Sequence, residues 1–127
     1  MEKVTGIGGM FFRARDPEVL GRWYQENLGV SLAPANYVDP PWWQESGPTV
    51  FAPFPATTDY FGRVEQVWMI NFRVQNLDRM VAQLTAVGIA VVVDPTPYPN
   101  GRFARAHDPE GNPIELWEPA GNDTEPT

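Results

Sequence analysis

The 127-residue chain contains no cysteine and a single histidine, His107. The lack of cysteine excludes disulfide bonds, thiolate metal ligands and a thiol nucleophile. The single histidine argues against a histidine-based catalytic triad or a site with several histidine ligands. Because His107 directly precedes a turn, it is better explained as a hairpin-end residue than as a catalyst. No serine lies in a recognisable nucleophile context either.

Basic residues are scarce and long apolar runs are absent. Nine Lys and Arg against 16 Asp and Glu give a formal net charge of −7, which argues against a nucleic-acid partner. No apolar run is long enough to span a bilayer, so we expect no membrane partner. No basic N-terminal segment leads into an apolar stretch, so we expect no signal peptide and a cytoplasmic protein.

Proline and tryptophan, by contrast, are plentiful, with 14 and five residues. The prolines lie mostly between the periodic segments, which is typical of stiff loops. The longest of these loops is predicted over residues 34–48. It carries two adjacent tryptophans, Trp42 and Trp43, that could cover a pocket or a partner surface.

A strand followed by a helix is predicted twice. Residues 5–15 alternate as a strand, Asp16 is a helix N-cap, and Gly29 ends the helix. About sixty residues later the same order returns, with a strand over 67–74 and a helix that begins after the N-cap Asn76 and ends at Gly88. Apolar residues recur along this helix at a spacing of three to four residues. This repetition indicates an internal duplication.

Further strands are predicted after each helix. In the second half they cover 89–93, 102–106 and 113–117; in the first half, 30–33 and 49–54 are clear and a middle strand is blurred. We therefore predict one domain, 1–119, made of two modules at about 4–62 and 64–119. Residues 55–65 join the halves, and the polar residues 120–127 are expected to form a frayed tail.

The turn Asp108-Pro109-Glu110-Gly111-Asn112 precedes the last predicted strand and is dense in turn-forming residues. In the strand itself the residues alternate. The aliphatic Ile114 and Leu116 share one face, whereas Glu115 and Trp117 share the other.

With these motifs the sequence resembles the vicinal oxygen chelate superfamily, which includes glyoxalase I, bleomycin-resistance proteins and extradiol dioxygenases. The resemblance runs from about residue 4 to residue 119. It rests on residues 12–18, 23–24, 28–29, 71–74 with 77–78, 101–104 and 108–116. It implies an α+β fold of two tandem βαβββ modules, whose curled mixed sheets form a concave cleft, and a homodimer. It is specific for the fold and weak for the reaction.

In that fold the apolar, even-numbered strand residues would meet the helices: Met10, Phe12, Ala14, Ile70, Phe72, Val74, Ile114 and Leu116. The opposite face would line the cleft: Gly9, Phe11, Arg13, Met69, Asn71, Arg73, Glu115 and Trp117.

The resemblance also implies positions for a divalent metal, because family enzymes bind one with His, Gln or Glu on the first and last strands of the modules. The first-strand positions here are Gly9 and Met69. On the last strands Glu115 matches a ligand, whereas its first-module counterpart is apolar, around Val50 or Phe51. One carboxylate is an incomplete ligand set, so we expect no metal cofactor.

Glu115 leaves two interpretations open. It is a general base or ligand-orienting acid, with a pKa raised by burial beside Trp117, or it is a hydrogen-bonded remnant of the duplication.

A pocket for a flat or cationic ligand could be lined by four aromatic residues: Trp42, Trp43, Trp117 and Phe11. Core packing or dimer contact better explains Trp23 and Trp68. Arg13 and Arg73 either clamp an anionic substrate or form strand-end salt bridges. Asn71 and Met69 complete the predicted ligand-binding residues.

Three functions are compatible with this pattern. The leading hypothesis is a metal-independent protein of the glyoxalase or bleomycin-resistance type that binds a small organic molecule in an aromatic, acidic cleft. The second is a metal-independent isomerase or epimerase with Glu115 as base. The third is a metal-dependent lyase or dioxygenase with non-standard ligands.

Overall fold

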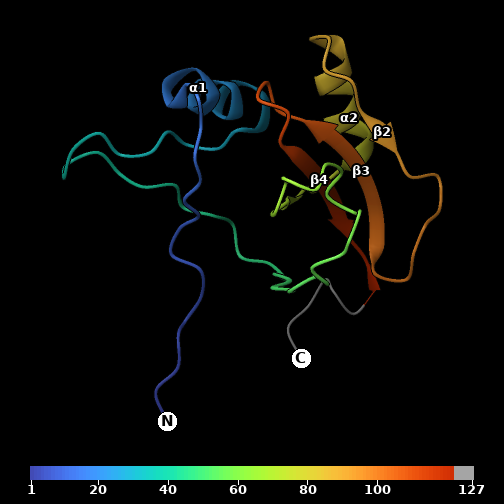
Figure 1. Ribbon diagram of the computed structural model, residues 1–127, viewed down its shortest axis with the longest axis horizontal. Coiled ribbons are helices and arrows are strands. Elements are labelled where there is room, and N and C mark those ends of the chain that lie inside the picture. Colours follow the sequence, from blue (N-terminus) through green and yellow to red (C-terminus); the bar gives the residue numbers. More distant parts are fainter. Residues whose placement is uncertain (122–127) are drawn as a thin grey trace.

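The computed structural model describes residues 1–121 and contains one mixed four-stranded sheet with two helices. The elements are α1 (Pro17–Leu28), β1 (Ile70–Arg73), α2 (Leu77–Ala86), β2 (Val92–Val93), β3 (Gly101–His107) and β4 (Pro113–Pro119) (Figure 1). The sheet order is β1-β4-β3-β2, with β1 parallel to β4 and the other pairs antiparallel. This is the predicted α+β class. Neither of the helices in residues 1–121 is long and apolar enough to cross a membrane.

Both helices begin and end where their capping residues predict. The Asp16 side chain accepts a hydrogen bond from the Val19 amide, and Gly29 takes the left-handed conformation at φ 72°. The Asn76 side chain likewise accepts from the Arg79 amide at 3.0 Å, and Gly88 follows the end of α2 at φ 84°. These boundaries were predictable because capping is a local property of the sequence.

One hydrophobic core joins the sheet to both helices. The apolar residues of β1 and β4 pair in register, Ile70 with Ile114 and Phe72 with Leu116, and their side chains point to the helices as predicted. The buried cluster comprises Leu20, Tyr24, Leu77, Leu84, Ala104, Ile114 and Leu116. Because α1 contributes two of these residues, the first half of the chain is packed against the sheet of the second half.

The turn after β3 connects the two halves through polar contacts. The buried carboxylate of Asp108 accepts from the Tyr24 hydroxyl at 2.7 Å and from the Asn112 side chain at 2.8 Å. The Glu110 carboxylate accepts from the two backbone amides just before α1, those of Arg15 and Asp16. Burial, and then the bond to Asp108, raises the pKa of Tyr24 well above its usual range.

His107 is the last residue of β3 and pairs with Pro113, so the prediction of a hairpin-end residue is confirmed. The structure shortens two other predictions: the strand expected over 67–74 begins at Ile70, and the one over 89–93 is reduced to Val92–Val93.

The first-half strands are a correction to the sequence analysis. Segments 5–15, 30–33 and 49–54 form no strand in the described chain, and Figure 1 draws this blue-to-green part outside α1 as trace without arrows. Glycines at 6, 8 and 9 offer no side chains to pack, and prolines at 48, 53 and 55 lack the donor that a strand ladder needs. Of the predicted tail, residues 122–127 lie outside the described residues.

The contact between Tyr24 and Asp108 predicts a measurable share of the stability. Tyr24→Phe should lower the free energy of unfolding by about 1.5–3 kcal/mol, because it removes a buried hydrogen bond to a charged group. The matched control, Tyr37→Phe, changes an exposed tyrosine and should stay within about 0.5 kcal/mol of the wild type. Urea unfolding followed by circular dichroism measures both, and equal losses would contradict the assignment.

Candidate functional site

The face of the sheet opposite the helices, here called the outer face, carries two rows of side chains. The strand register places Asn71, Glu115 and Arg105 side by side on β1, β4 and β3. The next row along the strands is Arg73, Trp117 and Phe103. Alternation along the strands therefore places four of the predicted cleft residues on one face, as expected: Asn71, Arg73, Glu115 and Trp117.

Glu115 lies at the centre of the polar row with both carboxylate oxygens occupied. Oε1 accepts a hydrogen bond from the Asn71 side chain at 2.7 Å. Oε2 accepts from the hydroxyl of Tyr60, a residue of the segment that joins the two halves. Glu115 is therefore held between its own sheet and the linker that covers it.

Arg105 holds the same tyrosine from the neighbouring strand. Its Nη2 donates to the backbone carbonyl of Tyr60 and to the sulfur of Met69, the latter at 3.2 Å. The centre of the guanidinium lies 4.7 Å from the centroid of the Tyr60 ring, which is cation–π distance. Phe54 also stacks on Tyr60, with ring centroids 5.7 Å apart.

The hydroxyl of Tyr60 is a proton donor at neutral pH. Partial burial, and then the hydrogen bond to Glu115, raises its pKa to about 12. Sequence reasoning missed both Tyr60 and Arg105. Alternation along 102–106 could have identified Arg105, whereas Tyr60 lies in a linker without periodicity.

Trp117 lies on the predicted face but is buried. Only 3% of its surface is exposed, its ring is parallel to that of Phe103, and its indole nitrogen donates to the Asn100 carbonyl at 2.9 Å. A side chain at Gly101 would collide with this indole and with the backbone of Glu118. Trp117 is therefore packed within the protein beside the polar row and does not present its ring to a ligand.

Arg73 binds backbone of the tryptophan-rich loop rather than a carboxylate. Its guanidinium donates to the carbonyls of Glu45 and Pro48, each at 2.7 Å, and to the Thr49 hydroxyl at 3.2 Å. The guanidinium also packs against Gly47, where a Cβ would lie 2.6 Å from Arg73 Nε. Arg73 thus anchors the loop, a role that neither sequence interpretation had considered.

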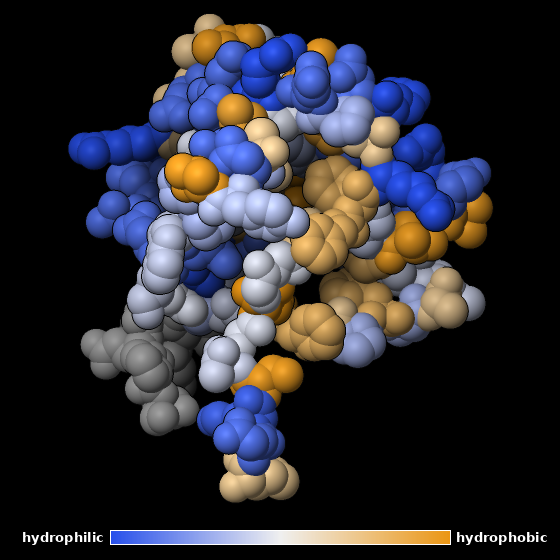
Figure 2. All heavy atoms as spheres, turned by 90° about the vertical axis from the view of Figure 1, so that its left-hand side faces the viewer, coloured by the Kyte–Doolittle hydropathy of each residue, from blue (hydrophilic) through white to orange (hydrophobic). Residues whose placement is uncertain are grey.

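The remaining predicted site residues lie away from Glu115. Trp42 and Trp43 line a cavity of about 350 Å³ beside α2, and Glu115 is not part of its lining. Phe11 is 96% exposed and borders a separate apolar groove along α1. Arg13 is exposed on the same N-terminal segment. Figure 2 shows apolar residues gathered on this side of the molecule.

The positions that the resemblance implies for a divalent metal do not fit one. On the first strands, Gly9 has no side chain and Met69 has a thioether that accepts a hydrogen bond from Arg105. The last-strand position of the first module is the apolar Val50 or Phe51. Glu115 supplies the one carboxylate, and its oxygens already accept from Tyr60 and Asn71. No group of three or more His, Cys, Asp or Glu residues is gathered anywhere in residues 1–121.

Residues 9–117 match the glyoxalase-like domain family. Because the match covers most of the chain, the protein belongs to this family, in agreement with the resemblance to the vicinal oxygen chelate superfamily. No curated protein sequence matches the chain.

Among solved structures, the chain is similar to TnmS3, an antibiotic binding protein from Streptomyces sp. CB03234. The two are 22% identical with a TM-score of 0.63, over 94% of this chain and 100% of that one. This likeness shows the shared fold.

Two shorter matches are to a glyoxalase/bleomycin resistance protein from Streptomyces sp. CB03234 and to a Bacillus anthracis protein assigned to the glyoxalase family. The first is 33% identical over 42% of this chain and 46% of that one, with a TM-score of 0.37. The second is 30% identical over 42% and 43%, with a TM-score of 0.38. The chain thus spans less than half the length of these two proteins.

The raised pKa of Tyr60 predicts a loss of stability at high pH. A tyrosine whose pKa rises from 10.0 to about 12 on folding stabilises the protein fully below pH 10 and loses this contribution between pH 10 and about 12. The free energy of unfolding should therefore fall less steeply over this range in Tyr60→Phe than in the wild type. Urea unfolding at several pH values measures both slopes, and identical slopes would contradict the contact with Glu115.

Proposed function

We propose that this protein binds a small aromatic molecule carrying a hydroxyl group at Glu115 on the outer face, without a metal ion. The observation that carries the proposal is the placement of Tyr60. Its hydroxyl donates to the Glu115 carboxylate while its ring lies against the Arg105 guanidinium. The site therefore already holds a phenol, supplied by the chain itself.

A phenolic ligand would reproduce each of these contacts. Its hydroxyl would donate to Glu115, a charge-assisted hydrogen bond, and its ring would stack on Arg105. Phe54 and Phe61, which pack around Tyr60, would supply apolar walls. Membership of the glyoxalase-like family supports small-molecule binding, and the TnmS3 protein with the same fold binds an antibiotic.

In this proposal Tyr60 is a gate that the ligand displaces. The ligand can bind only those molecules in which Tyr60 has left Glu115. Its apparent affinity is therefore the affinity of the open form multiplied by the fraction of molecules that are open. The linker that carries Tyr60 contains no helix or strand, so it is held mainly by these side-chain contacts. Removing the Tyr60 ring should therefore favour the ligand.

Binding of 2-naphthol, with 2-methoxynaphthalene as the ligand that lacks the hydroxyl hydrogen, tests the proposal by calorimetry. Glu115→Gln should weaken the binding of 2-naphthol by about tenfold, because the complex loses a hydrogen bond to a charged acceptor. The affinity for the methoxy compound should stay unchanged. The control Glu65→Gln alters an exposed carboxylate. Tyr60→Ala should strengthen 2-naphthol, whereas equal binding of both compounds to the wild type would contradict the proposal.

A second function, proton transfer in a metal-independent isomerase or epimerase, is favoured by the pairing of Glu115 with a tyrosine. A carboxylate and a protonated phenol in contact are a base and an acid, provided that a substrate separates them. Glu115→Gln would then abolish turnover of a carbonyl substrate and leave its binding intact. The third hypothesis, a metal-dependent enzyme, gains no support from the residues at the metal positions.

We also propose that the protein is a homodimer in which a second copy covers the first-half segments. Several large apolar side chains lie exposed there, with Phe51 85% exposed and Phe11 96%. Exposed apolar side chains in such number on one part of a chain favour an interface. Segments 5–15 and 49–54 keep their strand-forming pattern, so a neighbouring copy could supply the missing strand partners.

The dimer proposal predicts a mass of twice the chain in light scattering coupled to gel filtration. Phe51→Glu should shift the protein toward the monomer, because it places a charge in the apolar interface. Val87→Glu is the matched control, since Val87 is also exposed but lies after α2, outside the first-half segments. A monomeric wild type at micromolar concentration would overturn the proposal.

A further inference from the structure

The cavity of about 350 Å³ between the tryptophan-rich loop and α2 is separate from the Glu115 site. Its floor is apolar, with Leu28, Val74 and Met80, which pack at the edge of the core. Trp42 and Trp43 form its outer wall. The volume is at the lower end of the range for small-molecule pockets, about 300–1,000 Å³.

The wall of this cavity is fixed before any ligand arrives. The three hydrogen bonds from Arg73 hold residues 45–49 against the end of β1, one residue after the two tryptophans. Gly47 allows this close approach because it has no Cβ. A loop anchored in this way loses little conformational entropy when a ligand binds, which favours binding.

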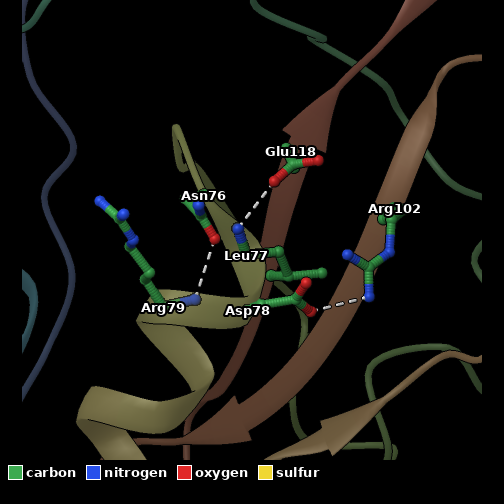
Figure 3. Close-up of polar contacts among 6 residues, drawn as sticks. All are labelled: Asn76, Leu77, Asp78, Arg79, Arg102 and Glu118. Atoms are coloured by element: carbon green, nitrogen blue, oxygen red, sulfur yellow. Dashed lines mark hydrogen bonds and ion pairs between the residues drawn. The ribbon is translucent and has the colours of Figure 1, made fainter.

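Arg79 supplies an unpaired positive charge to the cavity. Its backbone amide donates to Asn76, and its guanidinium makes no hydrogen bond or ion pair within residues 1–121. Figure 3 shows the guanidinium pointing away from the residues at the start of α2. A free guanidinium in the lining of a cavity is a common recognition element for a carboxylate.

The neighbouring acidic residues do not neutralise Arg79. Asp78 pairs with Arg102 at 3.0 Å, and Glu118 accepts from the Leu77 amide at 2.8 Å (Figure 3). Glu45 lies in the cavity lining and is the one carboxylate there, against the two guanidinium groups of Arg73 and Arg79 in the same lining. The cavity is therefore locally positive in a chain whose formal net charge is −7.

We propose that this cavity is a second binding site, for a planar aromatic carboxylate of one or two rings. The ring would stack against the tryptophans and the carboxylate would bind Arg79. Gln75 and Gln83, which also line the cavity, have amide groups that can complete the polar contacts. The proposal does not depend on the function of the Glu115 site, because the two linings share none of the residues that would contact a ligand.

Calorimetric titration of the full chain with 1-naphthoate tests whether the cavity recognises a carboxylate. The uncharged 1-naphthamide is the comparison. The naphthoate should bind about tenfold more tightly than the amide in the wild type, because only the carboxylate pairs with Arg79. Arg79→Gln should remove this difference, whereas Arg79→Lys should retain part of it. The control Arg22→Gln, an exposed arginine of α1 outside the cavity, should leave it unchanged.

Two further variants test the location. Trp43→Ala should weaken both compounds, and Gly47→Ala should do the same by displacing Arg73 from the loop. Glu115→Gln should change neither affinity. The proposal is overturned if naphthoate does not bind, if it binds no better than the amide, or if Glu115→Gln rather than Arg79→Gln removes the difference. Circular dichroism spectra confirm that each variant is folded.

Discussion

Glu115 accepts hydrogen bonds from two parts of the chain that are distant in sequence, Asn71 on β1 and Tyr60 in the linker. The first bond depends on the parallel register of β1 and β4, which sets the two residues opposite each other. The second depends on the linker folding back over the outer face. The closed arrangement of the site exists only while both conditions hold, because without the linker the carboxylate would lie on an open sheet.

A separate set of contacts brings the first half of the chain to this sheet. Asp108 and Glu110, in one turn of the second half, bind Tyr24 and the two backbone amides that directly precede α1. The core then buries Leu20 beside the residues of α2. The two tightly held regions, α1 and the Tyr60 linker, contact opposite faces of the sheet. The segments between them retain a large exposed apolar surface, which is the physical basis of the proposed dimer.

The sequence predicted those features that depend on local chemistry. Asp16 and Asn76 capped their helices, and alternation assigned Asn71, Glu115 and Trp117 to one face of the sheet. It could not predict pairing between distant segments, so the first-half strands were wrong and Tyr60 was missed. The residues predicted to line one pocket lie at two sites. Arg73 holds the tryptophan-rich loop beside α2, away from Glu115. The cytoplasmic location and the absence of a nucleic-acid partner stay predictions from composition.

The proposed gate depends most on the bond between Tyr60 and Glu115, and a double-mutant cycle measures this bond directly. Free energies of unfolding for the wild type, Tyr60→Phe, Glu115→Gln and the double variant give the coupling energy between the two side chains. We predict a favourable coupling of at least about 1 kcal/mol, as expected for a hydrogen bond to a charged acceptor that is partly exposed. A coupling near zero would show that the linker is not held over the outer face by this contact and would contradict the proposed gate.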